Sequence, residues 1–160
     1  MYDVIVEFPK MKVGVATRDG RVVGIRYLPP AAAAKPPASA LAERAALQLE
    51  RYREDPDTVF DLPLEVEGTP LQKGVWQAMC AIPRGRTRTY GELARELGTE
   101  PRAVGQACGD NRLPIVIPCH RVVASDGLGG FGHATGGYLL EAKRWLLMHE
   151  ARADAFELAP

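Results

Sequence analysis

The sequence predicts an α+β protein, with strands gathered near its N-terminus and helices in its second half. Apolar and polar residues alternate through residues 2–8, which is the period of a β-strand. Helix-capping motifs and apolar residues at helical spacing dominate the second half. Separate runs of strands and helices are typical of the α+β class. We therefore expect an N-terminal domain over residues 1–66, a C-terminal domain over residues 67–150, and a frayed tail over residues 151–160.

The N-terminal domain is predicted to continue with a hairpin and a connector. Asp19-Gly20 separates two apolar runs, residues 12–17 and 21–27, and this dipeptide is typical of a two-residue hairpin turn. Residues 29–39 are rich in proline and alanine and have no apolar periodicity. We therefore interpret them as a connector.

Helices are predicted on both sides of the domain boundary. Residues 40–53 favour a helix by propensity and end at an Asp-Pro-Asp segment. Thr69 and Gln72 form a capping box, and Pro70 stands at the first helical position. A second helix should therefore run from Pro70 to about Ile82.

Two short helices and one longer helix are predicted beyond this point. Thr89 and Glu92 form a second capping box, and the helix that they open should stop at Gly98. Another helix is expected over residues 101–109, so the pair has the pattern of a helix-turn-helix. Residues 138–150 should form a final amphipathic helix.

The composition of the chain excludes several classes of protein. The chain of 160 residues has a formal net charge of zero and 46% hydrophobic residues, as expected of a soluble globular protein. It contains no apolar run long enough to span a membrane and no signal peptide, so we expect a cytoplasmic protein. Its three cysteines do not form a disulfide pattern. Residues 84–121 carry a local excess of arginine, which either faces a polyanion or forms a solvated surface.

Cys119 is the candidate nucleophile. It lies in the stretch IVIPCHRVV, in which residues 115–117 are expected to form a short strand or extended segment. His120 and Arg121 follow it, and both can stabilise a thiolate, which is the attacking form of cysteine. Pro118 restricts the backbone before the sulfur. The alternative is an inert core cysteine, which is how we interpret Cys80 and Cys108.

His120 is either a general base or a satisfied core histidine. Neighbouring residues on a strand point to opposite sides, so a base would need a bridging water or a local twist to reach Cys119. A carboxylate that orients the imidazole should lie elsewhere in the chain. The cysteines and histidines show no metal-binding spacing, so we predict neither metal nor cofactor.

The helix-turn-helix is either a packing motif or a nucleic-acid reader. Arg84 and Arg86 precede it and Arg102 opens its second helix, at positions from which arginine can contact phosphate or enter a groove. Ala103 and Gly105 are small residues that let a backbone approach closely. These five residues are the DNA-binding candidates.

Five segments of the sequence carry a resemblance to a known family. They are GTPLQKGVWQAM, IPRGRTRTYGELA, RAVGQACGDN, PCHRV and KRWLLMHE. Over roughly residues 60–150 the chain resembles the 6-O-alkylguanine-DNA alkyltransferases, also called methylated-DNA–protein-cysteine methyltransferases. The family has a small N-terminal domain of ribonuclease-H-like type and a helical C-terminal domain with a helix-turn-helix.

The resemblance implies a role for each catalytic candidate. Cys119 would accept the alkyl group from guanine 6-O and keep it permanently. His120 would act as base through a water molecule, oriented by Glu150. Tyr90 would donate a hydrogen bond or proton to N3 of the departing guanine. Arg102 would enter the base stack and replace the flipped nucleotide.

The resemblance also implies supporting residues. Asn111, which could otherwise be an ordinary turn residue, and Arg121 would brace the site. The base pocket would be lined by Val122, Phe131, Thr135, Gly136 and Tyr138. The partner would be double-stranded DNA containing alkylated guanine, bound by a monomer without a membrane or metal.

DNA repair by direct reversal is therefore the predicted function, acting on 6-O-alkylguanine either alone or together with 4-O-methylthymine. One alternative is a non-catalytic protein that binds alkylated bases and recruits other repair factors. Another is a cysteine hydrolase, which would need an oxyanion hole and would turn over repeatedly.

Overall fold

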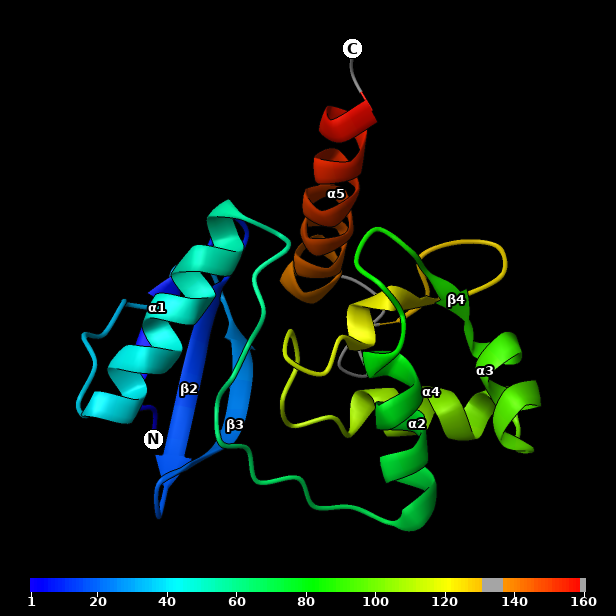
Figure 1. The fold of residues 1–160 in the computed structure, drawn as a ribbon, viewed down its shortest axis with the longest axis horizontal. Coiled ribbons are helices and arrows are strands. Elements are labelled where there is room, and N and C mark those ends of the chain that lie inside the picture. The colour runs from blue at the N-terminus through cyan, green and yellow to red at the C-terminus, as the bar shows by residue number, and fades with distance from the viewer. Residues whose placement is uncertain (131–136, 159–160) are drawn as a thin grey trace. The chain divides into compact units, whose positions relative to one another are not determined.

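The structure of the chain is a computed structural model that describes the backbone of residues 1–130 and 137–158, and the side chains of residues 1–130 and 137–151. The chain divides into two compact units, Met1–Val66 and Glu67–Pro160. The first unit holds a three-stranded sheet and one helix, and the second holds most of the helices (Figure 1). The predicted α+β class is confirmed.

The sheet of the first unit is a meander of three antiparallel strands in the order β1-β2-β3. The strands are β1 (Val4–Glu7), β2 (Lys12–Arg18) and β3 (Arg21–Leu28). Asp19 and Gly20, between β2 and β3, have φ values of 52° and 76°. Positive φ at both central residues is the pattern of a type I′ turn, which matches the twist of paired strands. The predicted hairpin is confirmed.

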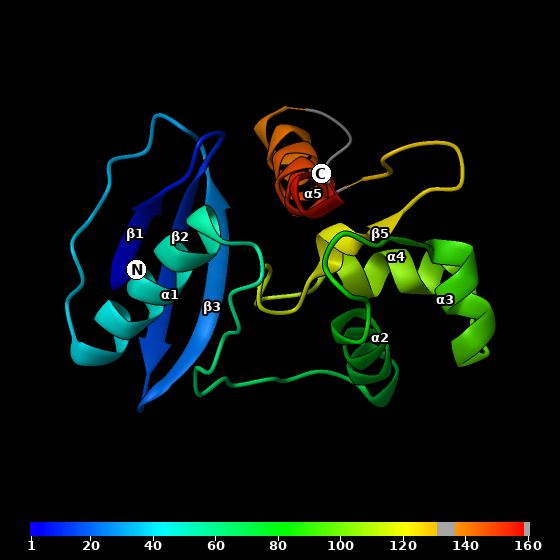
Figure 2. The same ribbon diagram turned by 45° about the horizontal axis from the view of Figure 1, so that its top comes forward.

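Helix α1 (Ala40–Glu54) covers one face of this sheet, as Figures 1 and 2 show. The helix begins at Ser39, whose hydroxyl accepts a hydrogen bond from the backbone N–H of Ala42 at 3.1 Å. The core of the unit is apolar and comes from both elements: Val4, Val6, Val13, Val15, Ile25, Ala42, Ala45 and Leu49 are buried. Burial of these side chains stabilises the unit.

The proline- and alanine-rich segment at residues 29–39 is not a detached connector. Ile5 and Lys35 exchange two backbone hydrogen bonds, of 3.0 and 3.1 Å, so the segment runs beside the outer edge of β1. Val22 bonds with residues 63–65 at the opposite edge of the sheet. Both edges of a small sheet are thereby covered, which removes the unpaired backbone groups that promote aggregation. These pairings are long-range, and composition does not reveal them.

The second unit begins with three helices: α2 (Pro70–Cys80), α3 (Tyr90–Leu97) and α4 (Pro101–Gly109). The two predicted capping boxes, Thr69–Gln72 and Thr89–Glu92, are both formed. Gly98 ends α3 in the left-handed conformation, with φ of 66°. Helix α2 ends two residues earlier than predicted. Helices α3 and α4 are joined by residues 98–100 and lie side by side (Figures 1 and 2), so they form the predicted helix-turn-helix.

Two very short strands bring the start of α3 beside the segment that carries Cys119. β4 (Arg88–Thr89) pairs in parallel with β5 (Val122–Val123), which follows the 3₁₀ helix η1 (Cys119–Arg121). The prediction of a strand or extended segment at residues 115–117 is wrong, because Ile115 and Val116 form a turn. Ile115 has a φ of 73°, which is incompatible with a strand.

The last element, α5 (Tyr138–Leu158), is longer than predicted. The sequence predicts that this helix ends at Glu150 and that the following residues fray, whereas the backbone stays helical through Leu158. Residues 151–158 contain good helix formers and neither glycine nor proline, so no stop signal lies at Glu150. Within the described residues, no helix combines the length and apolar character needed to cross a membrane.

Candidate active site and nucleic-acid interface

Cys119 opens η1 and is 6% exposed. Its backbone N–H donates to the carbonyl of Ile117 at 2.8 Å, and Pro118 between them has φ −81° and ψ 69°. This is an inverse γ-turn. The N–H of Arg121 then donates to the carbonyl of Pro118 at 3.0 Å. The cysteine therefore lies on two consecutive hydrogen-bonded turns.

Asn111 holds the loop that leads into these turns. Its side-chain Nδ2 donates to the carbonyl of Ile117 and its Oδ1 accepts from the N–H of Leu113, both at 2.9 Å. Between them lies Ile115, a buried β-branched residue with positive φ, a conformation that costs on the order of 1–3 kcal/mol. Burial raises the pKa of Cys119, and the side chain of Asn111 acts against this increase. One asparagine thus stabilises both a strained loop and the candidate nucleophile.

His120 and Arg121 meet at one buried carboxylate, that of Glu150 on α5. The Nε2 atom of His120 lies 2.9 Å from Glu150 Oε2. Arg121 donates to both carboxylate oxygens, from Nε at 3.0 Å and from Nη2 at 2.9 Å. It also donates from Nη1 to the carbonyl of Ile82 at 2.6 Å. Sequence spacing did not identify the carboxylate that would orient His120. In the structure, Glu150 is the carboxylate within hydrogen-bond distance of that imidazole.

Burial and hydrogen bonding determine the protonation states of this cluster. Burial alone would raise the pKa of Glu150, but the hydrogen bonds from His120 and Arg121 and the charge of Arg121 outweigh it and hold the pKa below its usual value. Burial lowers the pKa of His120 despite the nearby carboxylate. His120 is therefore neutral at pH 7 and donates from Nε2 to Glu150. Its Nδ1 atom is buried and makes no hydrogen bond with the described residues, so it can accept a proton.

The thiol of Cys119 is not preionised. Burial raises its pKa to about 11, although Asn111, Lys143 and the local backbone favour the thiolate. A thiol with this pKa is almost entirely protonated at neutral pH. The sulfur therefore needs a base at the moment of reaction, and His120 is the adjacent residue in η1.

Tyr90 lies beside the glycine-rich segment. Its hydroxyl donates to the carbonyl of Gly130 at 3.3 Å. A Cβ atom on Gly129 would lie 3.0 Å from the ring of Tyr90 and 3.2 Å from the backbone nitrogen of Ala124, and Gly129 has a φ of 76°. Glycine is therefore required at that position. Burial raises the pKa of Tyr90 to about 12, so the phenol stays protonated and can donate.

Sequence reasoning missed Lys143. Its side chain is completely buried in α5, and Nζ donates to the carbonyl of Gly130 at 3.0 Å. Burial lowers its pKa to about 8, although Cys119 and Cys108 favour the charged form. The available signal was position: Lys143 lies on the helix face that also buries Ala142 and Leu146. Cys108, interpreted from sequence as merely structural, therefore lies within electrostatic reach of the site.

The helix-turn-helix presents the other group of candidates. Arg102 is exposed in the first turn of α4, and Ala103 and Gly105 are partly exposed. A Cβ atom on Gly105 would meet no atom within 4 Å, so this part of α4 is open to a partner. Arg86 is exposed, whereas Arg84 is half-buried and donates to the backbone carbonyl of Glu150 at 3.3 Å. The structure thus places Arg84 against the buried cluster.

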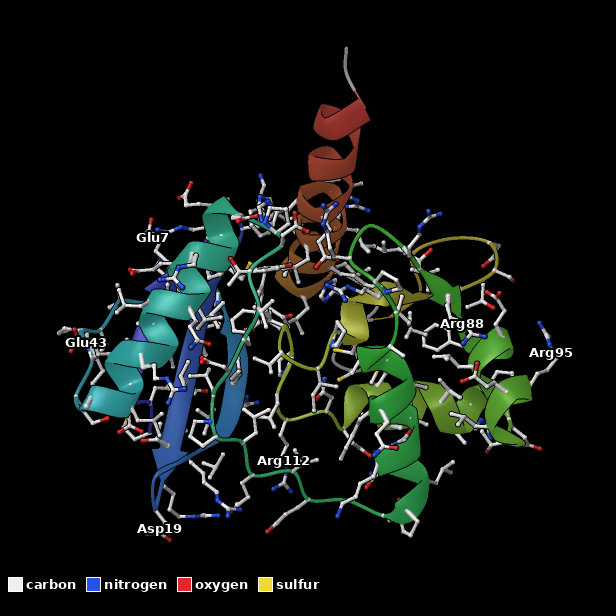
Figure 3. The ribbon with its side chains drawn as sticks, viewed as in Figure 1. Glu7, Asp19, Glu43, Arg88, Arg95 and Arg112 are labelled. Atoms are coloured by element: carbon white, nitrogen blue, oxygen red, sulfur yellow. The ribbon has the colours of Figure 1, made fainter. Side chains whose placement is uncertain are left out.

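Two further arginines flank this surface. Arg95 extends away from α3, and Arg88 lies at its start, paired with Glu96 at 2.6 Å (Figure 3). Both belong to the arginine-rich stretch, and the sequence grouped Arg88 with Arg84 and Arg86 as a residue that favours nucleic acid. An exposed arginine that is free to move can contact phosphate, and a paired one must first leave its carboxylate. Arg95 is therefore the better placed of the two.

The predicted base-pocket residues are only partly described. Val122 is completely buried in β5, and Tyr138 is partly exposed at the start of α5. Phe131, Thr135 and Gly136 lie outside the described residues. In the described part of the chain, no group of three or more histidine, cysteine, aspartate or glutamate side chains could hold a metal ion.

The fold and site together define an α+β protein that carries a helix-turn-helix and, in the same unit, a buried cysteine next to a histidine–glutamate pair. Residues 70–152 match the family model described as the DNA binding domain of 6-O-methylguanine DNA methyltransferase. The match covers more than half of the chain, so the chain belongs to this family, as the sequence motifs predicted.

Individual relatives agree with this assignment. The chain is 49% identical over 108 residues to the methylated-DNA–protein-cysteine methyltransferase of Methanosarcina barkeri, covering 66% of each chain. It is 43% identical over 122 residues to the regulatory protein ada of Salmonella typhimurium, covering 74% of this chain. The chain spans only 33% of that relative and less than two thirds of several others.

Solved structures show the same fold. The crystal structure of the Mycobacterium tuberculosis O6-methylguanine methyltransferase aligns with a TM-score of 0.77 and 32% identity, over 100% of this chain and 96% of that chain. Mycobacterium tuberculosis OGT in complex with DNA aligns with a TM-score of 0.74 and 33% identity, over 92% of this chain and 91% of that chain. The likeness therefore includes the N-terminal unit, which the sequence motifs did not cover.

Proposed function

We propose that the protein repairs DNA by moving an alkyl group from 6-O-alkylguanine to Cys119. The observation that carries this proposal is the position of Cys119 in η1, directly before a buried His120 that is bonded to Glu150. A buried thiol beside a neutral imidazole with one available nitrogen is suited to deprotonation on demand. The helix-turn-helix in the same unit supplies a surface for DNA. The relatives named as methyltransferases support the same function.

The proposed reaction conserves atoms and charge. The Cys119 thiol gives its proton to Nδ1 of His120 through a water molecule, and the thiolate attacks the alkyl carbon. The bond from that carbon to guanine oxygen breaks, and the electron pair stays on the guanine. Tyr90 donates a hydrogen bond to N3 of the departing guanine anion. The anion then takes up a proton at N1 from water, and His120 returns its proton to water, so the number of protons is unchanged. Cys119 becomes a thioether and the base becomes ordinary guanine.

DNA recognition follows from the geometry that this reaction needs. A 6-O substituent inside a duplex cannot reach a buried sulfur, so the nucleotide must leave the base stack. Arg102, exposed at the start of α4, is the residue that we propose fills the gap. The small residues Ala103 and Gly105 allow close approach of α4. Arg86 and Arg95 would contact phosphates, whereas Arg84 would act mainly on the Glu150 cluster.

A thioether is a poor leaving group, so each molecule should act once. We further propose that the protein acts as a monomer in the cytoplasm, where reducing conditions keep thiols free. Cys80, Cys108 and Cys119 are all free cysteines in the structure. The same chemistry applies to 4-O-methylthymine, which also carries an oxygen-linked methyl group, and we propose it as a second substrate.

Incubation with duplex DNA containing 6-O-methylguanine should add one methyl group per protein molecule, and no more. Intact mass spectrometry measures the gain, and peptide mapping locates it. Cys119→Ala should gain nothing, whereas the exposed Cys80→Ala should behave as the wild type. Binding of the lesion without any gain would favour the non-catalytic alternative. Repaired DNA in excess of protein would favour a hydrolase.

The rate of transfer should change little between pH 7 and pH 8. Burial holds the pKa of His120 below its usual value of about 6.5, so the neutral base already predominates at pH 7. Rapid-quench measurement of methyl transfer at several pH values tests this. Direct attack by free thiolate, without His120, would instead raise the rate about tenfold per pH unit, because the pKa of Cys119 is about 11. Such a slope would refute the role of His120 as base.

A further inference from the structure

Lys143 is the largest completely buried side chain of the described residues. A buried ammonium group is costly unless its surroundings compensate it, and an apolar side chain of similar length would fill the same space without that cost. The contacts of the Lys143 ammonium group therefore indicate what it does in the structure. Nζ donates to the carbonyl of Gly130 at 3.0 Å, and it lies 5.8 Å from the centroid of the Tyr90 ring.

The carbonyl of Gly130 links Lys143 to Tyr90. It accepts one hydrogen bond from Lys143 and another, of 3.3 Å, from the hydroxyl of Tyr90. The neighbouring Gly129 lies against the Tyr90 ring, since a Cβ atom on Gly129 would come within 3.0 Å of it. Fixing Gly130 from α5 therefore restricts where the phenol of Tyr90 can lie.

Helix α5, which carries Lys143, packs against η1, which carries Cys119, so the ammonium group lies within electrostatic range of the candidate nucleophile. The ionisable groups with which it interacts come from three elements: Cys119 and His120 of η1, Cys108 of α4, and Tyr90 of α3. A positive charge among two thiols favours the thiolate of the one that loses its proton. It also disfavours protonated His120, which keeps the base neutral until reaction.

We propose that Lys143 is a positioning residue for alkyl transfer, which anchors Gly130 and thereby Tyr90, and whose positive charge stabilises the thiolate of Cys119. The inference rests on the proposed function, since it assigns Lys143 to the same reaction. Lys143 would serve two requirements of that reaction. The sulfur of Cys119 must become negatively charged, and the phenol of Tyr90 must stay directed at the leaving guanine. One buried cation on α5 serves both.

Three substitutions separate charge from hydrogen bonding. Lys143→Met removes both, Lys143→Gln keeps a donor for Gly130 without the charge, and Lys143→Arg keeps both. The first readout is the rate at which iodoacetamide alkylates Cys119, followed by peptide mass spectrometry from pH 6 to pH 10. This readout needs no DNA. The second readout is the rate of methyl transfer from DNA containing 6-O-methylguanine.

The ammonium of Lys143 is charged below its pKa of about 8, so both uncharged variants should be alkylated at Cys119 about tenfold more slowly than the wild type at pH 6 to pH 7. The difference from the wild type should shrink as the pH rises above 8. Lys143→Arg should stay within a few-fold of the wild type. Methyl transfer should fall further in Lys143→Met than in Lys143→Gln, because only the former releases Gly130. Arg144→Met is the matched control: Arg144 is exposed, adjacent on α5 and paired with Glu141, and this variant should behave as the wild type.

An unchanged pH profile of Cys119 alkylation in Lys143→Gln, with its thermal unfolding unaltered, would overturn the electrostatic role. Equal methyl-transfer rates in the Gln and Met variants would overturn the anchoring role. If Lys143→Met does not fold, the comparison of Lys143→Gln with Lys143→Arg still decides whether the charge affects the alkylation of Cys119. Wild-type protein that fails to gain a methyl group would refute the proposed function, and the alkylation profiles would still report on Lys143.

Discussion

Glu150→Gln should lower the free energy of unfolding by about 3–5 kcal/mol, because the substitution leaves a buried guanidinium without its carboxylate. The Glu150 side chain is 1% exposed and that of Arg121 is 14% exposed, so water cannot replace the lost charge. Glutamine has nearly the same shape, which limits the effect to charge and hydrogen bonding. Urea-induced unfolding followed by circular dichroism measures the change.

Methyl transfer should also slow in Glu150→Gln, since the amide no longer fixes the tautomer of His120 that leaves Nδ1 available as acceptor. Glu141→Gln is the matched control on the same helix: its ion pair with Arg144 is about half exposed, so we expect a change within about 0.5 kcal/mol. Equal unfolding midpoints for the two variants would show that the buried cluster contributes nothing to stability.

The pH dependence of stability gives a second test of the same carboxylate. The folded pKa of Glu150 is below its usual value, so its contribution is present above about pH 4.3 and is lost as the pH falls toward the folded pKa. Wild-type protein should therefore lose stability in this acid range. Glu150→Gln should lose less over the same range, and an identical acid dependence would contradict the assignment.

Asn111→Ala should destabilise the protein by about 2–4 kcal/mol, because two backbone groups of buried residues lose their partner. These are the carbonyl of Ile117 and the N–H of Leu113, each 2.9 Å from the amide. The loop between them includes Ile115, whose positive φ persists only while its surroundings hold it. Without Asn111 the loop should relax and displace Cys119. We expect slower methyl transfer even in the folded fraction, measured by quenched reaction and intact mass.

Arg112→Ala is the control for this loop. Arg112 follows Asn111, is exposed and is labelled in Figure 3, and its replacement should change stability by less than about 0.5 kcal/mol. Asn111→Asp distinguishes the two hydrogen bonds. It keeps an acceptor for Leu113, loses the donor to Ile117 and adds a negative charge beside the sulfur. Transfer as fast in Asn111→Asp as in the wild type would rule out an electrostatic effect of Asn111 on Cys119.

Elements fixed by local interactions were predictable from the sequence. Both capping boxes, the Asp19-Gly20 turn and the Gly98 helix end depend on residues within a few positions of one another, so spacing alone indicates them. Within the site, Cys119 and His120 were found through their adjacency. Glu150 was found only through the family resemblance, because nothing local marks a carboxylate 30 positions away from its histidine.

Elements fixed by distant contacts were not predictable in this way. Residues 115–117 are apolar and β-branched, so an extended segment was expected, but the side chain of Asn111 imposes a turn. Residues 29–39 pair with β1 through backbone groups, which composition does not report. Lys143 has the side chain of a typical surface residue, and only its helical neighbours Ala142 and Leu146 indicate burial.

The position of Glu150 on the last helix has a consequence for biosynthesis. A chain is made from its N-terminus, so α3, α4 and η1 leave the ribosome before α5 does. Until α5 folds, His120 has no orienting carboxylate, and neither Lys143 nor its hydrogen bond to Gly130 is in place. The nascent polypeptide therefore contains α3 and α4 before it contains the residues that complete the candidate site. We expect a molecule truncated ahead of α5 to gain no methyl group, because it lacks both Glu150 and Lys143.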